Sequence, residues 1–219
     1  MNLIHKVVVG SRLHGLNNES SDYDYRGIFM HPLMEILSPY RKPKNTSWIE
    51  GDEDNTSYEL RDFCKFATQG NATILEILWS NMIIETSELG KELVANRHKF
   101  LDTERIYDAH KGYAHNQYKK MNLFEPDKRT PKFAVAYLRT LHQCKQLLET
   151  GDFNPQYDAP DKEFLLEVKY NWSEELIPEL SKSFARLQVG LADTYAKNHH
   201  KFKPDIKWIE EFIYRAYTN

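Results

Sequence analysis

The chain has 219 residues, of which 41% are hydrophobic and 28% are charged, which is the composition of a globular protein with one or two domains. Its formal net charge of −3 excludes a general electrostatic attraction to DNA or to an anionic membrane, although a local basic surface could still bind a polyanion. No apolar run approaches the length of a membrane-spanning helix.

The cysteine content and the N-terminal residues indicate a compartment. Cys64 and Cys144 stand apart in apolar helical patterns and match no zinc or redox spacing. Isolated thiols of this kind suit a reducing environment, and the apolar run near the N-terminus is too short for a signal peptide. We therefore expect a soluble protein of the cytoplasm.

Four β-strands are predicted in the N-terminal part of the chain. They cover Ile4–Val9, Tyr23–Met30, Thr46–Glu50 and Asp54–Glu59. β-branched and aromatic residues favour strands at these places. Gly10, His31-Pro32 and the GDED segment at residues 51–54 mark the turns between them.

From Leu60 onward, apolar residues recur at helical spacing. Helices are predicted for Leu60–Gly70, for the segment after the candidate cap Asn71, and for residues 102–121, 130–151, 173–198 and 205–217. The sequence therefore predicts an α+β protein. A small unit with the strands occupies residues 1–70, and an all-helical region occupies residues 71–219.

Residues 7–30, VVVGSRLHGLNNESSDYDYRGIFM, join a strand that ends at Gly10-Ser11 to a second strand that carries Asp22 and Asp24. Alternate residues of a strand point the same way, so the two carboxylates should share a face with their Cβ atoms roughly 6–7 Å apart. Such a pair can hold one or two Mg²⁺ ions, which prefer a few carboxylates together with substrate phosphates. Backbone N–H groups and the hydroxyl at Gly10-Ser11 suit a terminal phosphate. Phosphoryl or nucleotidyl transfer needs this layout.

Two other interpretations of this motif deserve comparison. An Asp-x-Asp pair also occurs by chance, and Asp22 could cap a polar turn. The glycine-serine turn and the two aspartates together favour a functional site over that interpretation. A P-loop phosphotransferase is excluded, because the chain has no G-x4-GK[ST] and Gly10-Ser11 lacks the lysine that such a loop requires.

The stretch GSRLHGLNNESSDYDYRGIF resembles the signature of the DNA polymerase β-type nucleotidyltransferase superfamily. It is most similar to a branch of predicted nucleotidyltransferases that includes the RNA-ligase-associated polymerases of RNA-repair gene clusters. Three later stretches also resemble that branch: YELRDFCKFATQGNATILEILWS, GYAHNQYKKM and KFAVAYLRTLHQCKQLLETGDF. The resemblance covers about residues 5–155. One departure is Ala72, where the branch commonly has a proline after the asparagine; it changes a helix start and no catalytic group.

The resemblance implies a small mixed β-sheet core with its active site near the N-terminus, completed by the helical region. Gly10, Ser11 and Arg12 would bind the triphosphate of a nucleotide. Asp22 and Asp24 would be catalytic and would bind two Mg²⁺ (or Mn²⁺) ions, one on the triphosphate and one that lowers the pKa of the attacking hydroxyl.

The superfamily also requires a third carboxylate on a neighbouring strand. Asp54 and Glu59 are the two candidates, at the beginning and the end of one predicted strand. Their odd separation places them on opposite faces of a regular strand, so both cannot serve unless a bulge intervenes. We favour Asp54 as the third metal ligand and catalytic residue, while Glu59 could instead cap the helix that follows.

Further candidates for nucleotide binding come from the second strand and from the helical region. Arg26 should share the face of Asp24, where it could neutralise the carboxylates or contact a phosphate. Lys132 and Arg139 lie two helical turns apart and resemble cations of the family, and we expect one of them to touch phosphate. Tyr113 and Gln117, at i and i+4, could frame a base or ribose. The alternatives are a solvated helix face for the cations and helix packing for Tyr113 and Gln117.

The leading functional hypothesis is transfer of a nucleoside monophosphate from an NTP to an acceptor hydroxyl, with release of pyrophosphate. The acceptor could be an RNA 3′ end, a protein or a small molecule. Basic segments with interleaved aromatic residues at 110–132 and 197–207 make RNA a possible partner. The last helix could pack on the protein's own core or on a second copy in a homo-oligomer. The alternative hypothesis is a non-catalytic nucleotide sensor or antitoxin-like partner protein with the same fold.

Overall fold

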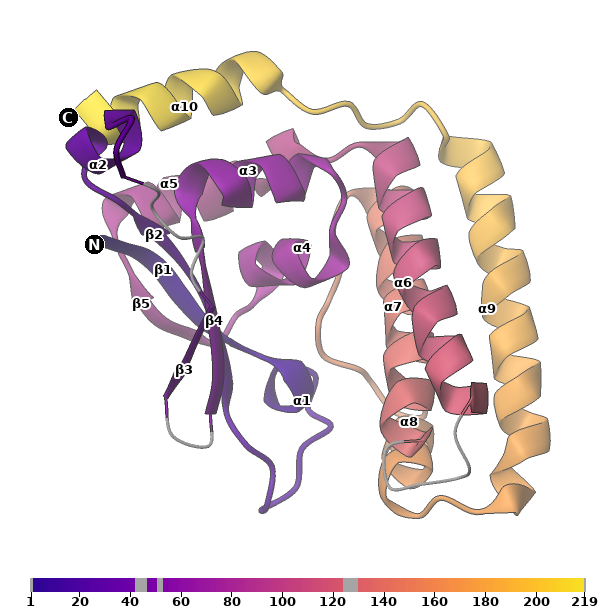
Figure 1. Cartoon of the computed structure of the whole chain (residues 1–219). Helices are drawn as coiled ribbons and strands as arrows, with labels where there is room; N and C mark the ends of the chain where they lie inside the picture. The colour runs from indigo at the N-terminus through magenta and orange to yellow at the C-terminus, as the bar shows by residue number, and fades with distance from the viewer. Residues whose placement is uncertain (1, 42–46, 51–52, 124–129, 219) are drawn as a thin grey trace.

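The computed structural model of the chain describes residues 2–41, 47–50, 53–123 and 130–218, with only the backbone described at residues 47–50, 53–55, 122 and 123. Within these ranges a five-stranded sheet lies on one side of the molecule and the long helices lie on the other (Figure 1). This arrangement confirms the predicted α+β fold with a helical C-terminal part. No described helix combines the length and the apolar character needed to cross a membrane.

Within the described ranges, the first four strands, interrupted by two short helices, precede the longer helices, and the fifth strand follows the fourth helix. The strands are β1 (Asn2–Val9), β2 (Asp24–Met30), β3 (Ser47–Glu50), β4 (Glu53–Glu59) and β5 (Ile83–Thr86). The helices are α1 (Gly10–Leu13), α2 (Leu33–Leu37), α3 (Leu60–Thr68), α4 (Ala72–Trp79), α5 (Glu88–Ala95), α6 (Thr103–Leu123), α7 (Thr130–Thr150), α8 (Asp161–Tyr170), α9 (Ile177–Asn198) and α10 (Ile206–Thr218), with short 3-10 helices η1 (Arg97–Phe100) and η2 (Glu174–Leu176).

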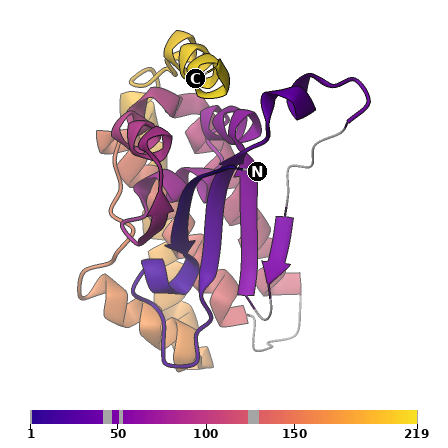
Figure 2. The same cartoon turned by 90° about the vertical axis from the view of Figure 1, so that its left-hand side faces the viewer.

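The sheet is mixed, with the strand order β3-β4-β2-β1-β5. β1 runs antiparallel to β2 and to β5, while β2 and β4 are parallel. Figure 2 shows the strands side by side with one face of the sheet toward the viewer. The prediction of an all-helical region was wrong for β5, which adds an edge strand from residues beyond 70. The proposed start of the third strand at Thr46 lies outside the described residues.

Helices α3, α4 and α5 pack beside the sheet and bury its apolar face (Figure 1). Val7, Val9 and Ile28 of the sheet join residues such as Phe63 and Leu75 in one core. Both predicted helix caps are confirmed. The Asn71 Oδ1 accepts hydrogen bonds from the first backbone N–H groups of α4, and Glu59 accepts one from the N–H of Arg61 at the start of α3.

The helical region is built on α6 and α7, which pack as an antiparallel pair, and α9 lies against α7. The apolar face predicted for α7 is buried and includes Ala134, Leu138, Leu141 and Cys144. α8 also packs against α7, but the sequence analysis assigned no element to its residues.

The last helix, α10, crosses back to the N-terminal part of the chain and lies along α3 (Figure 1). Trp208 stacks on Phe212 and meets Phe100 edge to face. At its far end the hydroxyl of Tyr217 donates a hydrogen bond to the buried carboxylate of Glu59. The chain's own core therefore covers the apolar face of this helix.

We expect Tyr217→Phe to destabilise the protein by about 1–3 kcal/mol, because Glu59 would keep a buried oxygen without its donor. Urea denaturation of the variant and the wild type measures this difference. Equal free energies of unfolding would show that the Tyr217–Glu59 contact does not hold α10 to α3.

Candidate functional site

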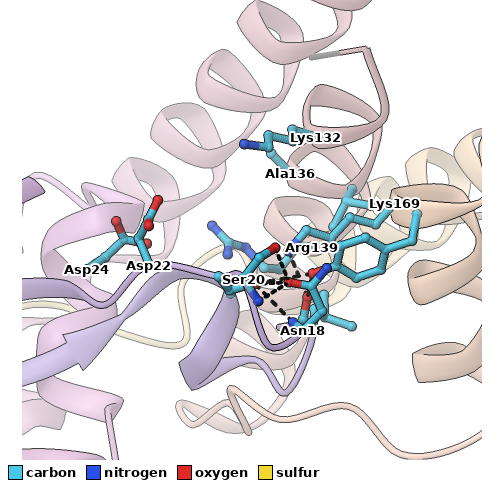
Figure 3. Close-up of a pocket in the computed structure, with 13 residues that line it drawn as sticks. Asn18, Ser20, Asp22, Asp24, Lys132, Ala136, Arg139 and Lys169 are labelled. Atoms are coloured by element: carbon cyan, nitrogen blue, oxygen red, sulfur yellow. Dashed lines mark hydrogen bonds between the residues drawn. The ribbon is translucent and has the colours of Figure 1, made fainter. Parts of the chain in front are cut away.

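A cavity of about 370 Å³ lies between the loop that precedes β2 and the helices α7 and α8. Ser11, Asp22 and Asp24 line it from the N-terminal side. Lys132, Ala136 and Arg139 of α7 and Lys169 and Tyr170 of α8 line it from the helical side (Figure 3). We call it the α8-side cavity. It brings together groups from parts of the sequence far from one another.

The backbone at Gly10 fixes the position of Asp24. In the antiparallel pair of β1 and β2, Asp24 lies opposite Val9, the residue before Gly10. Gly10 has φ +68°, and a Cβ atom there would lie 2.1 Å from the Oδ2 of Asp24. A side chain at this position would collide with the carboxylate and strain the backbone. Glycine therefore lets the carboxylate lie directly against the turn that begins α1.

Asp22 reaches the same cavity by a different route from the one predicted. β2 begins at Asp24, so Asp22 belongs to the preceding loop, and the prediction that both aspartates alternate on a regular strand was wrong. Hydrogen bonds hold this loop: the Asn18 Oδ1 accepts from the backbone N–H of Ser20 at 3.1 Å and from the Ser21 hydroxyl at 3.0 Å. Local side chain to backbone bonds of this type stabilise turns in competition with strands.

Arg12 also holds this loop. Its Nη2 donates to the backbone oxygen of Ser21 at 2.6 Å, its Nε donates to that of Asp22 at 3.3 Å, and its guanidinium lies 3.8 Å above the ring of Tyr23. Arg12 is not among the lining residues of the α8-side cavity. In this structure its side chain holds the loop that carries Asp22, and its predicted contact with a nucleotide stays a prediction.

Three cations face the carboxylates across the α8-side cavity. Lys132 and Arg139 lie on one side of α7, as their spacing predicts. Sequence reasoning missed the third, Lys169. Its Nζ donates to the backbone oxygen of Leu16 at 2.7 Å, and the hydroxyl of Tyr170 donates to the same oxygen at 3.0 Å. The apolar spacing of Leu165 and Val168 could have shown the helix, but not its place beside the aspartates.

A buried pair of titratable groups lies behind Arg139. The Nε2 of His14 lies 2.5 Å from the Oε1 of Glu76, and its Nδ1 lies 2.6 Å from the backbone oxygen of Pro155. Burial alone would raise the pKa of Glu76, but the Arg139 guanidinium and His14 lower it to about 2. The Nη2 of Arg139 lies 4.0 Å from the Oε1 of Glu76. The ionised carboxylate thus fixes a cation at the wall of the cavity.

A second, smaller cavity of about 160 Å³ adjoins the first at Asp24 and Arg139, and we call it the α6-side cavity. Among the described residues, these two line both cavities. Arg26 lines it beside Asp24, as the strand alternation predicts, and Tyr113 lines it from α6. Gln117, the predicted neighbour of Tyr113, is buried and does not line it.

The two candidates for a third carboxylate occupy different places. Asn55 pairs with Tyr25 in the parallel β2–β4 ladder, so Asp54 precedes it at the level of Asp24. The side chain of Asp54 lies outside the described residues. Glu59 is buried at the opposite end of β4, opposite Phe29, and caps α3. The structure does not bring Glu59 to the site.

The described residues contain no group of three or more acidic, histidine or cysteine side chains placed to hold a metal ion. Asp22 and Asp24 provide two carboxylates at one cavity, and Mg²⁺ is commonly bound by one or two carboxylates together with substrate phosphates and water. The described side chains therefore fit a metal that arrives with a phosphorylated ligand.

Comparison with known proteins identifies a family. The model of the RNA repair pathway DNA polymerase beta family matches residues 1–188 of the chain. None of the curated proteins matches the chain. The match includes β1 to β5, α8 and every residue named above as lining the two cavities.

We expect Glu76→Gln to destabilise the protein by about 3 kcal/mol at pH 7, because it leaves the largely buried guanidinium of Arg139 without its counter-charge and removes the carboxylate that His14 contacts. The pKa of Glu76 in the folded state lies below the ordinary value of 4.5, so its ionised form contributes stability above pH 4.5 that is lost as the pH falls toward 2.

The difference between wild type and Glu76→Gln should therefore shrink below pH 4.5. Urea denaturation at pH 7, 4 and 3 measures it, with the exposed Glu88→Gln as the control. A difference that is independent of pH would contradict the low pKa of Glu76.

Proposed function

Since the chain belongs to the RNA repair pathway DNA polymerase beta family, we propose that it is a nucleotidyltransferase. It transfers a nucleoside monophosphate from an NTP to an acceptor hydroxyl and releases pyrophosphate, with Mg²⁺ or Mn²⁺ as the metal. The single observation that carries this proposal is the α8-side cavity, where Ser11, Asp22 and Asp24 face Lys132, Arg139 and Lys169.

A metal–triphosphate complex matches both walls of this cavity. The triphosphate carries several negative charges, which Lys132, Arg139 and Lys169 can neutralise through charge-assisted hydrogen bonds. The hydroxyl of Ser11 and the N-terminal turn of α1 supply further donors. Asp22 and Asp24 would hold the metal, which when bound neutralises phosphate charge and lowers the pKa of the attacking hydroxyl.

The reaction exchanges one bond to phosphorus for another. The acceptor oxygen forms a bond to the α-phosphorus of the NTP, the bond from that phosphorus to the bridging oxygen of the β-phosphate breaks, and pyrophosphate leaves. The proton of the acceptor hydroxyl passes to solvent. Catalysis of this kind depends mainly on positioning and on electrostatic stabilisation of the phosphoryl oxygens. The chain's contribution is to hold cations and carboxylates at fixed places before substrate binds.

The same observation argues against a non-catalytic sensor. A protein of this fold that had lost catalysis would be expected to have lost these acidic side chains, because binding a nucleotide without a metal needs the cations and is opposed by carboxylates, which repel phosphate. The presence of both aspartates beside Ser11 favours the enzyme.

The activity assay measures transfer of label from an α-labelled NTP to an acceptor in the presence of Mg²⁺ or Mn²⁺. We expect the double variant Asp22→Asn, Asp24→Asn to be at least 100-fold slower than wild type, which corresponds to roughly 3 kcal/mol in activation free energy. Asn preserves the size of Asp and removes its charge. Asp193→Asn on the exposed side of α9 is the control and should keep full activity. Transfer that persists in the double variant would contradict the metal assignment.

We expect Lys169→Ala to raise the KM for the NTP about 10- to 100-fold, because it removes a hydrogen bond to a charged phosphate. Such a hydrogen bond contributes about 1.5–3 kcal/mol. Steady-state kinetics with varied NTP measures this change. Lys162→Ala is a matched control, because Lys162 lies two turns earlier on α8 and lines neither cavity. An unchanged KM in Lys169→Ala would exclude α8 from the triphosphate site.

A further inference from the structure

The two cavities beside Asp24 differ in chemistry. Lys132 and Lys169 line only the α8-side cavity. The α6-side cavity has no lysine among its described lining residues; the ring of Tyr113, uncharged polar groups such as Thr73 and Gln143, and the oppositely charged Arg26, Arg139, Asp24 and Glu76 line it. The first suits a polyphosphate, whereas the second suits a nucleoside with a single phosphate near it.

Their arrangement around Asp24 also matters. An in-line displacement at phosphorus requires the attacking oxygen and the leaving pyrophosphate to lie on opposite sides of the reacting phosphoryl group. The two cavities meet at Asp24 and Arg139. If the triphosphate occupies the α8-side cavity, the acceptor hydroxyl can approach from the α6-side cavity.

Tyr113 lines the α6-side cavity, and its ring is accessible to a ligand. Its side chain remains 37% exposed. Within the described part of the chain its hydroxyl makes no hydrogen bond and its ring makes no aromatic contact. A Cβ atom on the neighbouring Gly112 would meet nothing within 4 Å, so the helix surface at residue 112 is also open. An exposed aromatic ring next to a reaction centre can stack on a nucleobase.

The helix segment that continues from Tyr113 is basic. Residues 109–123 of α6 contain three lysines and neither aspartate nor glutamate. Asn116 and Lys120 follow Tyr113 by three and seven residues and lie on the same side of the helix. The Nζ of Lys120 lies 5.7 Å from the ring of Phe133, next to Lys132 on α7. This side of α6 therefore leads away from the cavity along a row of donors and positive charge.

We propose that the acceptor is a single-stranded RNA whose 3′-terminal nucleoside occupies the α6-side cavity against Tyr113. The phosphates that precede it follow α6 past Asn116 to Lys120. This proposal rests on the nucleotidyltransferase function proposed above. It assigns the NTP and the acceptor to separate cavities and makes Tyr113 a residue for the acceptor.

The test measures RNA and NTP binding separately. Fluorescence anisotropy of a short 5′-labelled single-stranded RNA is recorded without NTP, and binding of a fluorescent NTP analogue with Mg²⁺ is recorded without RNA. The variants are Tyr113→Ala and Lys120→Ala, both at exposed positions. Lys182→Ala on α9 is the matched control for a surface lysine that lines neither cavity.

We expect Tyr113→Ala to weaken RNA binding about 10-fold, as loss of one stacked base implies, with an unchanged salt dependence. Lys120→Ala should weaken RNA binding and reduce the slope of log K against log salt by about 0.7, the value for one phosphate contact on a single strand. Both variants should bind the NTP analogue within about twofold of wild type, and Lys182→Ala should match wild type in both assays.

Other results overturn the proposal. Weaker NTP binding by Tyr113→Ala with unchanged RNA binding would place the base of the NTP in the α6-side cavity. Unchanged binding of both ligands would make Tyr113 a surface residue without a ligand. RNA binding without any transfer of label would contradict the proposed enzyme while leaving the RNA surface in place. Transfer of label to another acceptor without RNA binding would support the proposed enzyme and contradict the RNA surface.

Discussion

The contact between Gly10 and Asp24 is the constraint on which the rest of the site depends. β1 must be followed by a residue that has no Cβ and tolerates φ +68°, because the carboxylate of Asp24 occupies the space that a side chain of residue 10 would take. The β1–β2 register then fixes the distance between this carboxylate and the turn at Ser11. The proposed metal ligand and the proposed phosphate-binding turn are thereby held together by backbone geometry.

The second constraint is electrostatic. Carboxylates and cations face each other across the α8-side cavity. One of these cations, Arg139 of α7, contacts the buried Glu76–His14 pair behind it. Ionised Glu76 is stable in the interior because the charge of Arg139 and the hydrogen bonds to His14 and Gln143 compensate its burial. The arrangement is preorganised for a ligand that carries both positive and negative charge, which a metal–triphosphate complex does. Fixed charges of this kind need no reorganisation during the reaction.

Local sequence signals predicted much of the fold. The four N-terminal strands, the caps Asn71 and Glu59 and the long helices follow from β-branched runs, short polar side chains and apolar periodicity. β5 was missed because four residues, IIET, are too few to show a strand period and gain their partner only from β1. Asp22 was placed on a strand because periodicity does not reveal the competing turn around Asn18.

The candidate site was predictable only where it is local in sequence. Ser11, Asp22 and Asp24 belong to one short motif, and Lys132 and Arg139 share one helix face. Lys169 enters the cavity from a helix more than a hundred residues from the motif, so only the tertiary fold shows its place. The same holds for the division into two cavities, which arises where α4, α6 and α7 meet the end of the sheet.

A crystal structure of the protein with Mg²⁺ and a non-hydrolysable NTP analogue tests the central claim most directly. The account requires oxygens of Asp22 and Asp24 at about 2.1 Å from a metal ion that also contacts the phosphates. It also requires the triphosphate to lie in the α8-side cavity between Ser11 and the three cations. A triphosphate bound elsewhere, or a metal that neither aspartate contacts, would contradict it.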